Sequence, residues 1–230
     1  MAPAAQPAER VLRFGYDGRV KAVAEIAVTN ALLTVATLGI YRFWAKTRLR
    51  RYIWGRIELA GDRLEYSGTG MELLLGFLVA LLVLVPLVAI DYLAASFLPP
   101  GSSLLGIEQI AYALIIWFLI NLALFRARRY RLTRTRWRGL RFTQTGSGAS
   151  FAVTMMAWQF LVAITFFLAN PFYRTARQKY LTDNTRFGNH ELRFLGQGSD
   201  LFGAWFVAWL LMIPTLAFLT HFHGVVRQNF

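Results

Sequence analysis

The chain has 230 residues, of which 56% are hydrophobic, and its mean hydropathy is +0.43. Soluble domains contain about 45–50% apolar residues by a comparable count, so a soluble globular enzyme and a disordered tail are excluded. Lys and Arg total 25 against 12 Asp and Glu, and these charges lie in blocks between long uncharged stretches. Such alternation indicates an integral membrane protein. The absence of Cys excludes disulfides, thiol catalysis and Cys-ligated metals.

The N-terminal residues 1–9 are rich in Ala and Pro, and the first basic residue is Arg10. A positively charged region leading into an apolar core is missing there, so a cleaved signal peptide is not predicted. We interpret residues 1–9 as a disordered lead and residues 10–230 as a single membrane domain.

Five apolar stretches have about the 20 residues that a helix needs to cross the hydrocarbon core of a bilayer. They cover about residues 22–41, 71–98, 104–125, 150–173 and 201–220. The sequence therefore predicts a mainly α-helical, polytopic membrane protein with about five membrane segments. Residues 99–103, Pro-Pro-Gly-Ser-Ser, carry no charge and predict a tight helical hairpin whose turn lies on the outer side.

Three internal repeats are predicted at about residues 46–70, 124–148 and 174–198. Each contains a Tyr followed sixteen residues later by a Gly-x-Gly triplet, and fixed spacing of this kind is typical of a repeat. The residues concerned are Tyr52, Gly68 and Gly70; Tyr130, Gly146 and Gly148; and Tyr180, Gly196 and Gly198. A phosphate-binding loop has a longer glycine-rich pattern that follows a strand and begins a helix, and that fuller pattern is missing here. We therefore interpret the triplets as tight turns into the bilayer.

A small β-hairpin is predicted inside these basic blocks. Residues 56–59 and 63–66 alternate charged and apolar side chains on either side of Ala-Gly-Asp, which is typical of a hairpin. Residues 186–194 have the same pattern around Gly188 and Asn189. Each block is therefore expected to be a basic helix followed by a small hairpin.

Two topologies remain open for the first and fourth apolar stretches. If both cross the membrane, 16 Lys and Arg residues lie inside and 9 outside. If both enter and return on the same side, 24 lie inside and one outside, which satisfies the positive-inside rule better. Their length favours crossing. The interruptions at residues 37–39, Thr-Leu-Gly, and 170–171, Asn-Pro, favour re-entrant segments, which must be buried in protein.

A long signature adds a family resemblance. Residues 30–34 read Asn-Ala-Leu-Leu-Thr, and residues 37–45 read Thr-Leu-Gly-Ile-Tyr-Arg-Phe-Trp-Ala; the same pattern continues in Arg51-Tyr52, Tyr66-x-Gly68 and residues 183–188. Over about residues 14–202 the chain closely resembles the bacterial inner-membrane YjgN family, a domain of unknown function, although this chain is shorter than the better-known members. The resemblance implies the family's fold and an inner-membrane location, but no activity, substrate or catalytic residues.

The basic blocks are the first candidate site. Basic residues beside a membrane helix bind anionic lipid headgroups at about 1 kcal/mol each, and they also serve as ordinary orientation signals. We expect anionic membrane lipids rather than nucleic acid as partners. The candidate lipid-contacting residues are Arg50, Arg51, Arg126, Arg128, Arg129, Arg131, Arg177 and Lys179.

Polar residues inside the apolar stretches are the second candidate site, because intramembrane polar groups can line a path for ions or protons. They are Asp91, Glu108, Asn30 and Asn121. We favour a simpler interpretation for the two carboxylates, in which both are hydrated at the outer interface near the Pro-Pro-Gly turn.

No nucleophile, paired-carboxylate site or metal cluster stands out, so neither enzymatic activity nor a cofactor or metal is expected. His221 and His223 are interpreted as part of an interfacial C-terminal end, and His190 as a solvated residue of a hairpin turn. The leading hypothesis is a non-enzymatic inner-membrane scaffold or lipid-contacting component with a basic cytoplasmic face, able to form a homo-oligomer. The alternatives are a small transporter or channel using the four polar residues and, third, a lipid-modifying enzyme.

Overall fold

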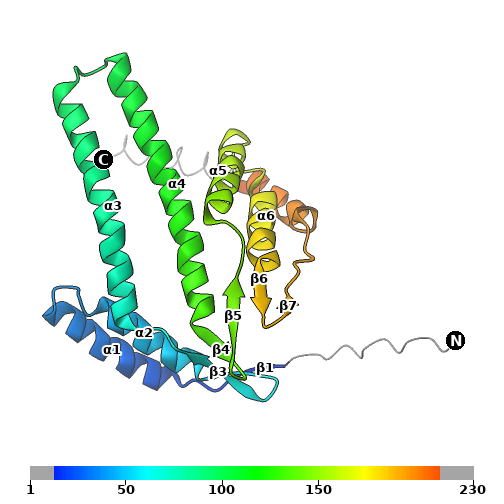
Figure 1. The fold of residues 1–230 in the computed structure, drawn as a ribbon. Helices are drawn as coiled ribbons and strands as arrows, with labels where there is room; N and C mark the ends of the chain where they lie inside the picture. Colours follow the sequence, from blue (N-terminus) through cyan, green and yellow to red (C-terminus); the bar gives the residue numbers. More distant parts are fainter. Residues whose placement is uncertain (1–12, 213–230) are drawn as a thin grey trace, which may run out of the picture. The chain divides into compact units, whose positions relative to one another are not determined.

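The computed structural model describes residues 13–212. The chain divides into two compact units, one formed by residues up to 112 with 129–142, the other by 113–128 with the residues from 143 onward. The ribbon in Figure 1 is mainly helical, with short strands between the helices. The predicted lead at 1–9, the end of the fifth apolar stretch, His221 and His223 lie outside the described residues.

The first apolar stretch forms one arm of a helical hairpin in the first unit. Helix α1 (Val20–Ala36) is followed by a tight turn and by the basic helix α2 (Arg42–Trp54). The Thr37 hydroxyl accepts the N–H of Tyr41 at 2.9 Å, and Leu38 and Gly39 have positive φ. The amide of Asn30 donates to the carbonyl of Ala45 at 3.2 Å, so the two helices run back along each other.

The two longest helices follow. They are α3 (Gly70–Phe97) and α4 (Ser103–Thr133), joined by a short turn as predicted. Among the described residues, these are the two helices long and apolar enough to cross a membrane. The most apolar window of α3 has no buried residue, as expected for a helix that faces lipid.

The strands of the first unit form an antiparallel meander in which sequence neighbours are neighbours in the sheet. They are β1 (Phe14–Tyr16), β2 (Ile57–Leu59), β3 (Asp62–Tyr66), β4 (Thr135–Trp137) and β5 (Leu140–Gln144), whose last two residues belong to the second unit. Positive φ at Ala60 and Gly61 closes the β2–β3 hairpin, whose prediction from the sequence is confirmed.

Strand pairing fixes where the helices of this unit begin and end. β1 precedes α1 and pairs with β2, which follows α2; β3 precedes α3 and pairs with β4, which follows α4. Each helix pair therefore leaves the sheet and returns to it. The α1–α2 pair, of which the first apolar stretch forms one arm, accordingly begins and ends at the same end of the unit.

The second unit repeats this arrangement. Its elements are α5 (Gly148–Ile164), α6 (Asn170–Asp183), β6 (Thr185–Phe187), β7 (His190–Glu191) and the apolar helix Gly198–Met212. The Thr165 hydroxyl accepts a hydrogen bond from the N–H of Ala169 at 3.2 Å, and the two residues after Thr165 have positive φ. The chain therefore turns back after α5 in the same way as it does after α1.

The ends of the α5–α6 pair also meet. The hydroxyl of Tyr180 donates to the carbonyl of Ser147 at 2.9 Å, and the N–H of Thr145 donates to the carbonyl of Asn184 at 2.8 Å. Phe125, Phe151, Met155 and Leu181 form the buried core between the helices of this unit. A total of about five crossings is therefore not confirmed: two described helices qualify, while the α1–α2 and α5–α6 pairs each end where they begin.

Cysteine accessibility tests this topology. We expect that Asn189→Cys, in the turn between β6 and β7, reacts with a membrane-impermeant thiol reagent only after the cells are permeabilised. Ser102→Cys, between α3 and α4, should react in intact cells, and Thr143→Cys should not. Labelling of Asn189→Cys in intact cells would mean that the fourth stretch crosses the membrane. The chain has no native Cys to interfere.

Candidate functional site

Close helix packing explains the second glycine of each Gly-x-Gly triplet. A Cβ on Gly70 would lie 2.6 Å from the Trp44 ring, and one on Gly198 would lie 2.5 Å from the Phe172 ring. On Gly148 it would meet Leu122 at 2.8 Å. The expectation of a tight turn at all the triplets was wrong: of their six glycines only Gly146 has positive φ, and the others lack a side chain for steric reasons.

The tyrosine of each repeat binds the backbone in front of a preceding helix. The hydroxyl of Tyr52 accepts the N–H of Arg19 at 3.2 Å, just before α1. Tyr130 donates to the carbonyl of Thr69 at 3.5 Å, and Tyr180 binds Ser147 in the same way. The contact therefore recurs in all three repeats, with a residue 33 or 61 positions earlier and not with the triplet that follows the tyrosine by sixteen. The triplets and tyrosines serve the framework rather than a phosphate site.

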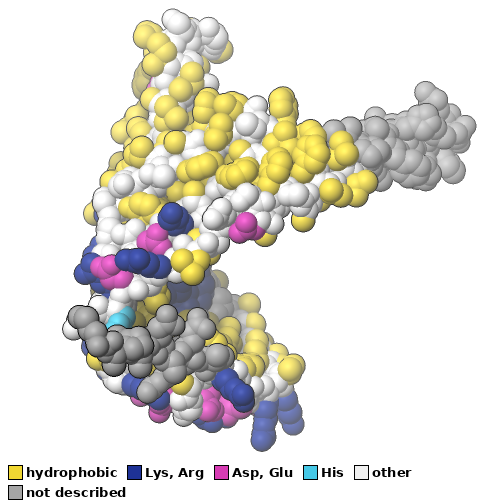
Figure 2. Space-filling view, turned by 90° about the vertical axis from the view of Figure 1, so that its right-hand side faces the viewer, with side chains coloured by type: hydrophobic (Ala, Val, Ile, Leu, Met, Phe, Trp, Pro, Cys, Tyr) yellow, Lys and Arg dark blue, Asp and Glu magenta, His cyan; other side chains and the backbone are white. Residues whose placement is uncertain are grey.

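The eight basic candidate residues fall into two groups. Arg50, Arg128, Arg131 and Arg177 are half-buried, whereas the exposed members are Arg51, Arg126, Arg129 and Lys179. Figure 2 shows a largely hydrophobic surface on which Lys and Arg side chains gather in separate patches beside Asp and Glu. Only the second group is exposed on the surface of the described chain.

Two of the half-buried arginines, Arg50 and Arg131, lie close to each other. Arg50 donates to the hydroxyl of Tyr66 at 3.2 Å, and Tyr66 is only 5% exposed. Arg131 lies in the basic extension of α4, beyond the apolar part that ends at Phe125. Burial, and then the positive charge of Arg50, lower the pKa of Arg131. Two arginines therefore lie near each other at the end of the long helices.

A further charged cluster was missed by the sequence analysis. Glu72, in the first turn of α3, accepts bonds from Arg134 at 2.6 Å and from the hydroxyl of Tyr130 at 2.8 Å. Burial, and then the bond to Glu72, raise the pKa of Tyr130, so its hydroxyl remains a donor. The signal was present as Thr69-x-x-Glu72, a capping box that the structure contains.

A polar cluster joins three helices of the second unit. Gln159 of α5 accepts bonds from Trp117 Nε1 at 2.6 Å and from Asn121 Nδ2 at 3.1 Å, both on α4. Its own amide donates to the hydroxyl of Tyr173 on α6 at 3.1 Å. Asn121 is 2% exposed, and its amide also donates to the carbonyl of Trp117. These bonds join neighbouring helices within an otherwise apolar packing.

The other three polar candidates lie in the first unit. Asn30 is buried and bonds Ala45, and its side-chain oxygen has no hydrogen-bond partner in the described part of the chain. Asp91 and Glu108 are half-buried on α3 and α4. Glu108 has one buried carboxylate oxygen without a partner among residues 13–212. Asn30 and Asn121 are thus each bonded within their own unit, and among residues 13–212 no hydrogen bond joins one of the four candidates to another.

Metal-binding chemistry finds no support among the described residues, which contain no group of three or more His, Asp or Glu able to hold an ion. His190 is exposed, in agreement with its prediction as a solvated residue of the hairpin.

These features define a helical membrane protein with two long apolar helices, shorter helical hairpins that turn back, and a small antiparallel sheet. Residues 11–230 match a family model described as a bacterial protein of unknown function, and the chain belongs to that family, DUF898.

Curated relatives agree with this assignment and with the resemblance found in the sequence. The chain is 40% identical over 57 residues to "Inner membrane protein YjgN" of Escherichia coli (strain K12), a match that covers 25% of this chain and 14% of the relative. It is 38% identical over 58 residues to the Salmonella typhimurium protein of the same name, covering 25% and 15%. The chain thus matches only a small part of the length of these relatives. The expected inner-membrane location is confirmed. No solved structure matches the chain.

Proposed function

We propose that this protein is a non-enzymatic component of the bacterial inner membrane that binds anionic lipid headgroups through its basic cytoplasmic face. The observation that carries this proposal is the exposure of Arg126 and Arg129, directly beyond the apolar part of α4. The extension from residue 126 to 141 holds eight arginines and no acidic residue. A phosphate group in the headgroup region would meet these charges, because 31 residues of helix span about 46 Å, more than the hydrocarbon core.

The internal pairing of the other charges supports this assignment. Arg134 is held by Glu72, Arg138 by Asp62, and Arg56 and Arg63 by Asp17. Arg126 and Arg129 form no ion pair among the described residues, so their charge is available to an external anion. This distribution favours a contact surface at the end of α4 rather than a uniform basic coat.

A transporter or channel has one observation in its favour, the buried and unpartnered carboxylate oxygen of Glu108. The contacts of Asn121 disfavour transport, because the amide group of Asn121 is used in bonds to Trp117 and Gln159 that join neighbouring helices. We therefore place transport second.

Thermal unfolding in a neutral detergent tests lipid binding. Phosphatidylglycerol should raise the melting temperature of the wild-type protein, while phosphatidylcholine should not, because a ligand that binds the folded state stabilises it. In Arg126→Gln/Arg129→Gln the phosphatidylglycerol shift should shrink, by about 1 kcal/mol for each arginine removed. For a chain of this size that amounts to about 2–4 °C per substitution.

The matched control removes the same charge elsewhere. Arg56→Gln/Arg63→Gln acts on residues already paired with Asp17 and should leave the lipid-dependent shift unchanged. Equal loss in both double variants, or equal stabilisation by phosphatidylcholine, would show that the α4 arginines have no special role in lipid binding.

A further inference from the structure

The last described strand has an open edge. β7 pairs with β6 through Arg186↔Glu191, and the N–H of Leu192 donates to the carbonyl of Thr185 at 3.0 Å. Backbone groups of successive residues in a strand point to opposite edges, so those of Glu191 and Arg193 point away from β6. β7 ends the strand order, and no described strand pairs with this outer edge.

The same edge is occupied in the first two repeats. There the N–H of Ser67 donates to the carbonyl of Arg134 at 2.8 Å, and the N–H of Thr145 donates to that of Asn184 at 2.8 Å. Leu195 holds the corresponding position of the third repeat, one residue before the first glycine of its triplet. Within residues 13–212 its N–H has no backbone partner. An unpaired strand edge is a template for another strand.

The charge of Arg193 limits which strand can pair with the outer edge of β7. In the first repeat Glu65 lies opposite Arg136, but the corresponding residue of the third repeat is Arg193. A further strand of the β4 or β6 type would bring an arginine against Arg193, and like charges directly opposite each other are destabilising. Arg193 has no ion pair in the described part of the chain. The complementary strand must therefore carry an acid at that point.

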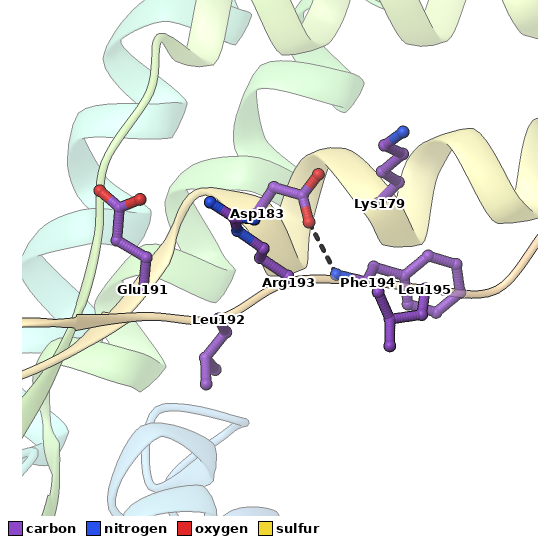
Figure 3. A pocket seen from close by; sticks show the side chains of 7 residues that line it. All are labelled: Lys179, Asp183, Glu191, Leu192, Arg193, Phe194 and Leu195. Carbon is purple, nitrogen blue, oxygen red and sulfur yellow. Dashed lines mark hydrogen bonds between the residues drawn. The ribbon is translucent and has the colours of Figure 1, made fainter. Parts of the chain in front are cut away.

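The side chains along this segment alternate as in a strand. Figure 3 shows Glu191 and Arg193 on one side of the backbone and Leu192 on the other. The N–H of Phe194 donates to the Asp183 carboxylate at 2.8 Å, which holds the segment against the end of α6. A shallow open pocket borders the segment and includes Lys179. The outer edge is thus extended and accessible.

We propose that this edge binds the same edge of a second copy of the chain, as an antiparallel pair about a two-fold axis through Leu192. In this register Glu191 of each copy lies opposite the partner's Arg193, and the partner's Glu191 lies opposite Arg193. These two pairs exchange backbone hydrogen bonds, and the two Leu192 side chains meet on the other face. The segment is therefore self-complementary in charge, as a two-fold interface requires.

The proposed contact between the two copies is short, and its small buried area limits its affinity. Three residues from each copy bury far less than the roughly 1,200 Å² of a stable soluble interface. We therefore expect a weak contact that forms where the membrane confines and orients the copies, and its detection calls for trapping in native membranes.

Disulfide trapping tests the register. Leu192→Cys should give a cross-linked dimer when isolated membranes are oxidised, because residues on the axis form a pair with Cα atoms about 4.5 Å apart, within the range of a disulfide. Leu195→Cys is the control, since the side chain is 87% exposed against 40% for Leu192. In the proposed register the two Leu195 residues of a dimer lie about 20 Å apart, so Leu195→Cys should not cross-link. Random collision would instead cross-link the more exposed Leu195→Cys more readily than Leu192→Cys.

Charge variants in the Leu192→Cys background test the ionic pairs. Arg193→Glu should lower the dimer yield by about fivefold, because it places acids opposite each other. Glu191 also forms an ion pair with Arg186 of its own hairpin, at 2.5 Å. Co-expression of differently tagged Arg193→Glu and Glu191→Arg chains should restore the dimer as a mixed species, because every pair across the interface then again has opposite charges. The mixed species also shows that both variants fold.

Three results would overturn the proposal. They are the absence of a Leu192→Cys dimer in oxidised membranes, a Leu195→Cys dimer of equal or higher yield, and an unchanged yield for Arg193→Glu.

Discussion

Gly70→Ala is expected to lower the free energy of unfolding by about 2 kcal/mol, the usual cost of an extra group in a well-packed contact. The new Cβ would lie 2.6 Å from Trp44 Cγ and 2.9 Å from its Cα, and the backbone of α2 cannot move aside as a flexible side chain can. α3 would be pushed off α2 at its first turn. Tryptophan fluorescence during thermal unfolding in detergent should show a melting temperature lower by about 4–8 °C.

Gly76→Ala is the matched control on the same helix. A Cβ at Gly76 would have nothing within 4 Å, and alanine is a better helix former than glycine by up to about 1 kcal/mol. This variant should unfold at the wild-type temperature or slightly above it. If both variants behaved alike, the effect at Gly70 would come from helix propensity and not from contact with Trp44.

Gln159→Leu is expected to destabilise the second unit by about 2 kcal/mol, although leucine is close to glutamine in size. It leaves the Nε1–H of Trp117 and one amide N–H of Asn121 without their acceptor in a buried site. An unsatisfied buried group costs about 1–3 kcal/mol, and interhelical hydrogen bonds in membranes are worth about 0.6 kcal/mol on average. The fluorescence of Trp117 should also change in the folded state.

A double-mutant cycle separates the hydrogen bonds from packing. Asn121→Leu/Gln159→Leu removes both polar partners and should cost less than the sum of the two single variants, because fewer groups are left unsatisfied. Gln178→Leu, on the exposed side of α6, is the control and should lie within about 0.5 kcal/mol of wild type. Additive single effects would contradict a connected cluster around Gln159.

Part of the site could be read from residue types alone. The hairpins followed from alternation around Ala60 and Gly61, and the basic blocks from their composition. The Tyr and Gly spacing was visible, but its cause was not, because the contact of Gly70 with Trp44 joins residues from different helices.

The polar residues were harder to assign. Asn121 was visible in an apolar stretch, yet its partner Gln159 lies 38 positions further along the chain. A sequence pattern cannot distinguish a polar group that lines a path from one that bonds a neighbouring helix. Glu72 and Arg134 are 62 positions apart in the chain, and their ion pair forms because α4 returns to the start of α3. Local sequence does not reveal this pair either.

The sequence by itself determined that this is a helical membrane protein, which apolar stretches are longest, and where hairpins and basic ends lie, because these depend on local composition and periodicity. Only the tertiary structure decided that the chain turns back after α1 and after α5. Their 17 residues are apolar enough to suggest crossing, but the pairing of β1 with β2 brings the end of α2 back to the start of α1, and the bond from Tyr180 to Ser147 brings α6 back to the start of α5. Such long-range backbone contacts depend on which segments meet, and local sequence does not encode that choice.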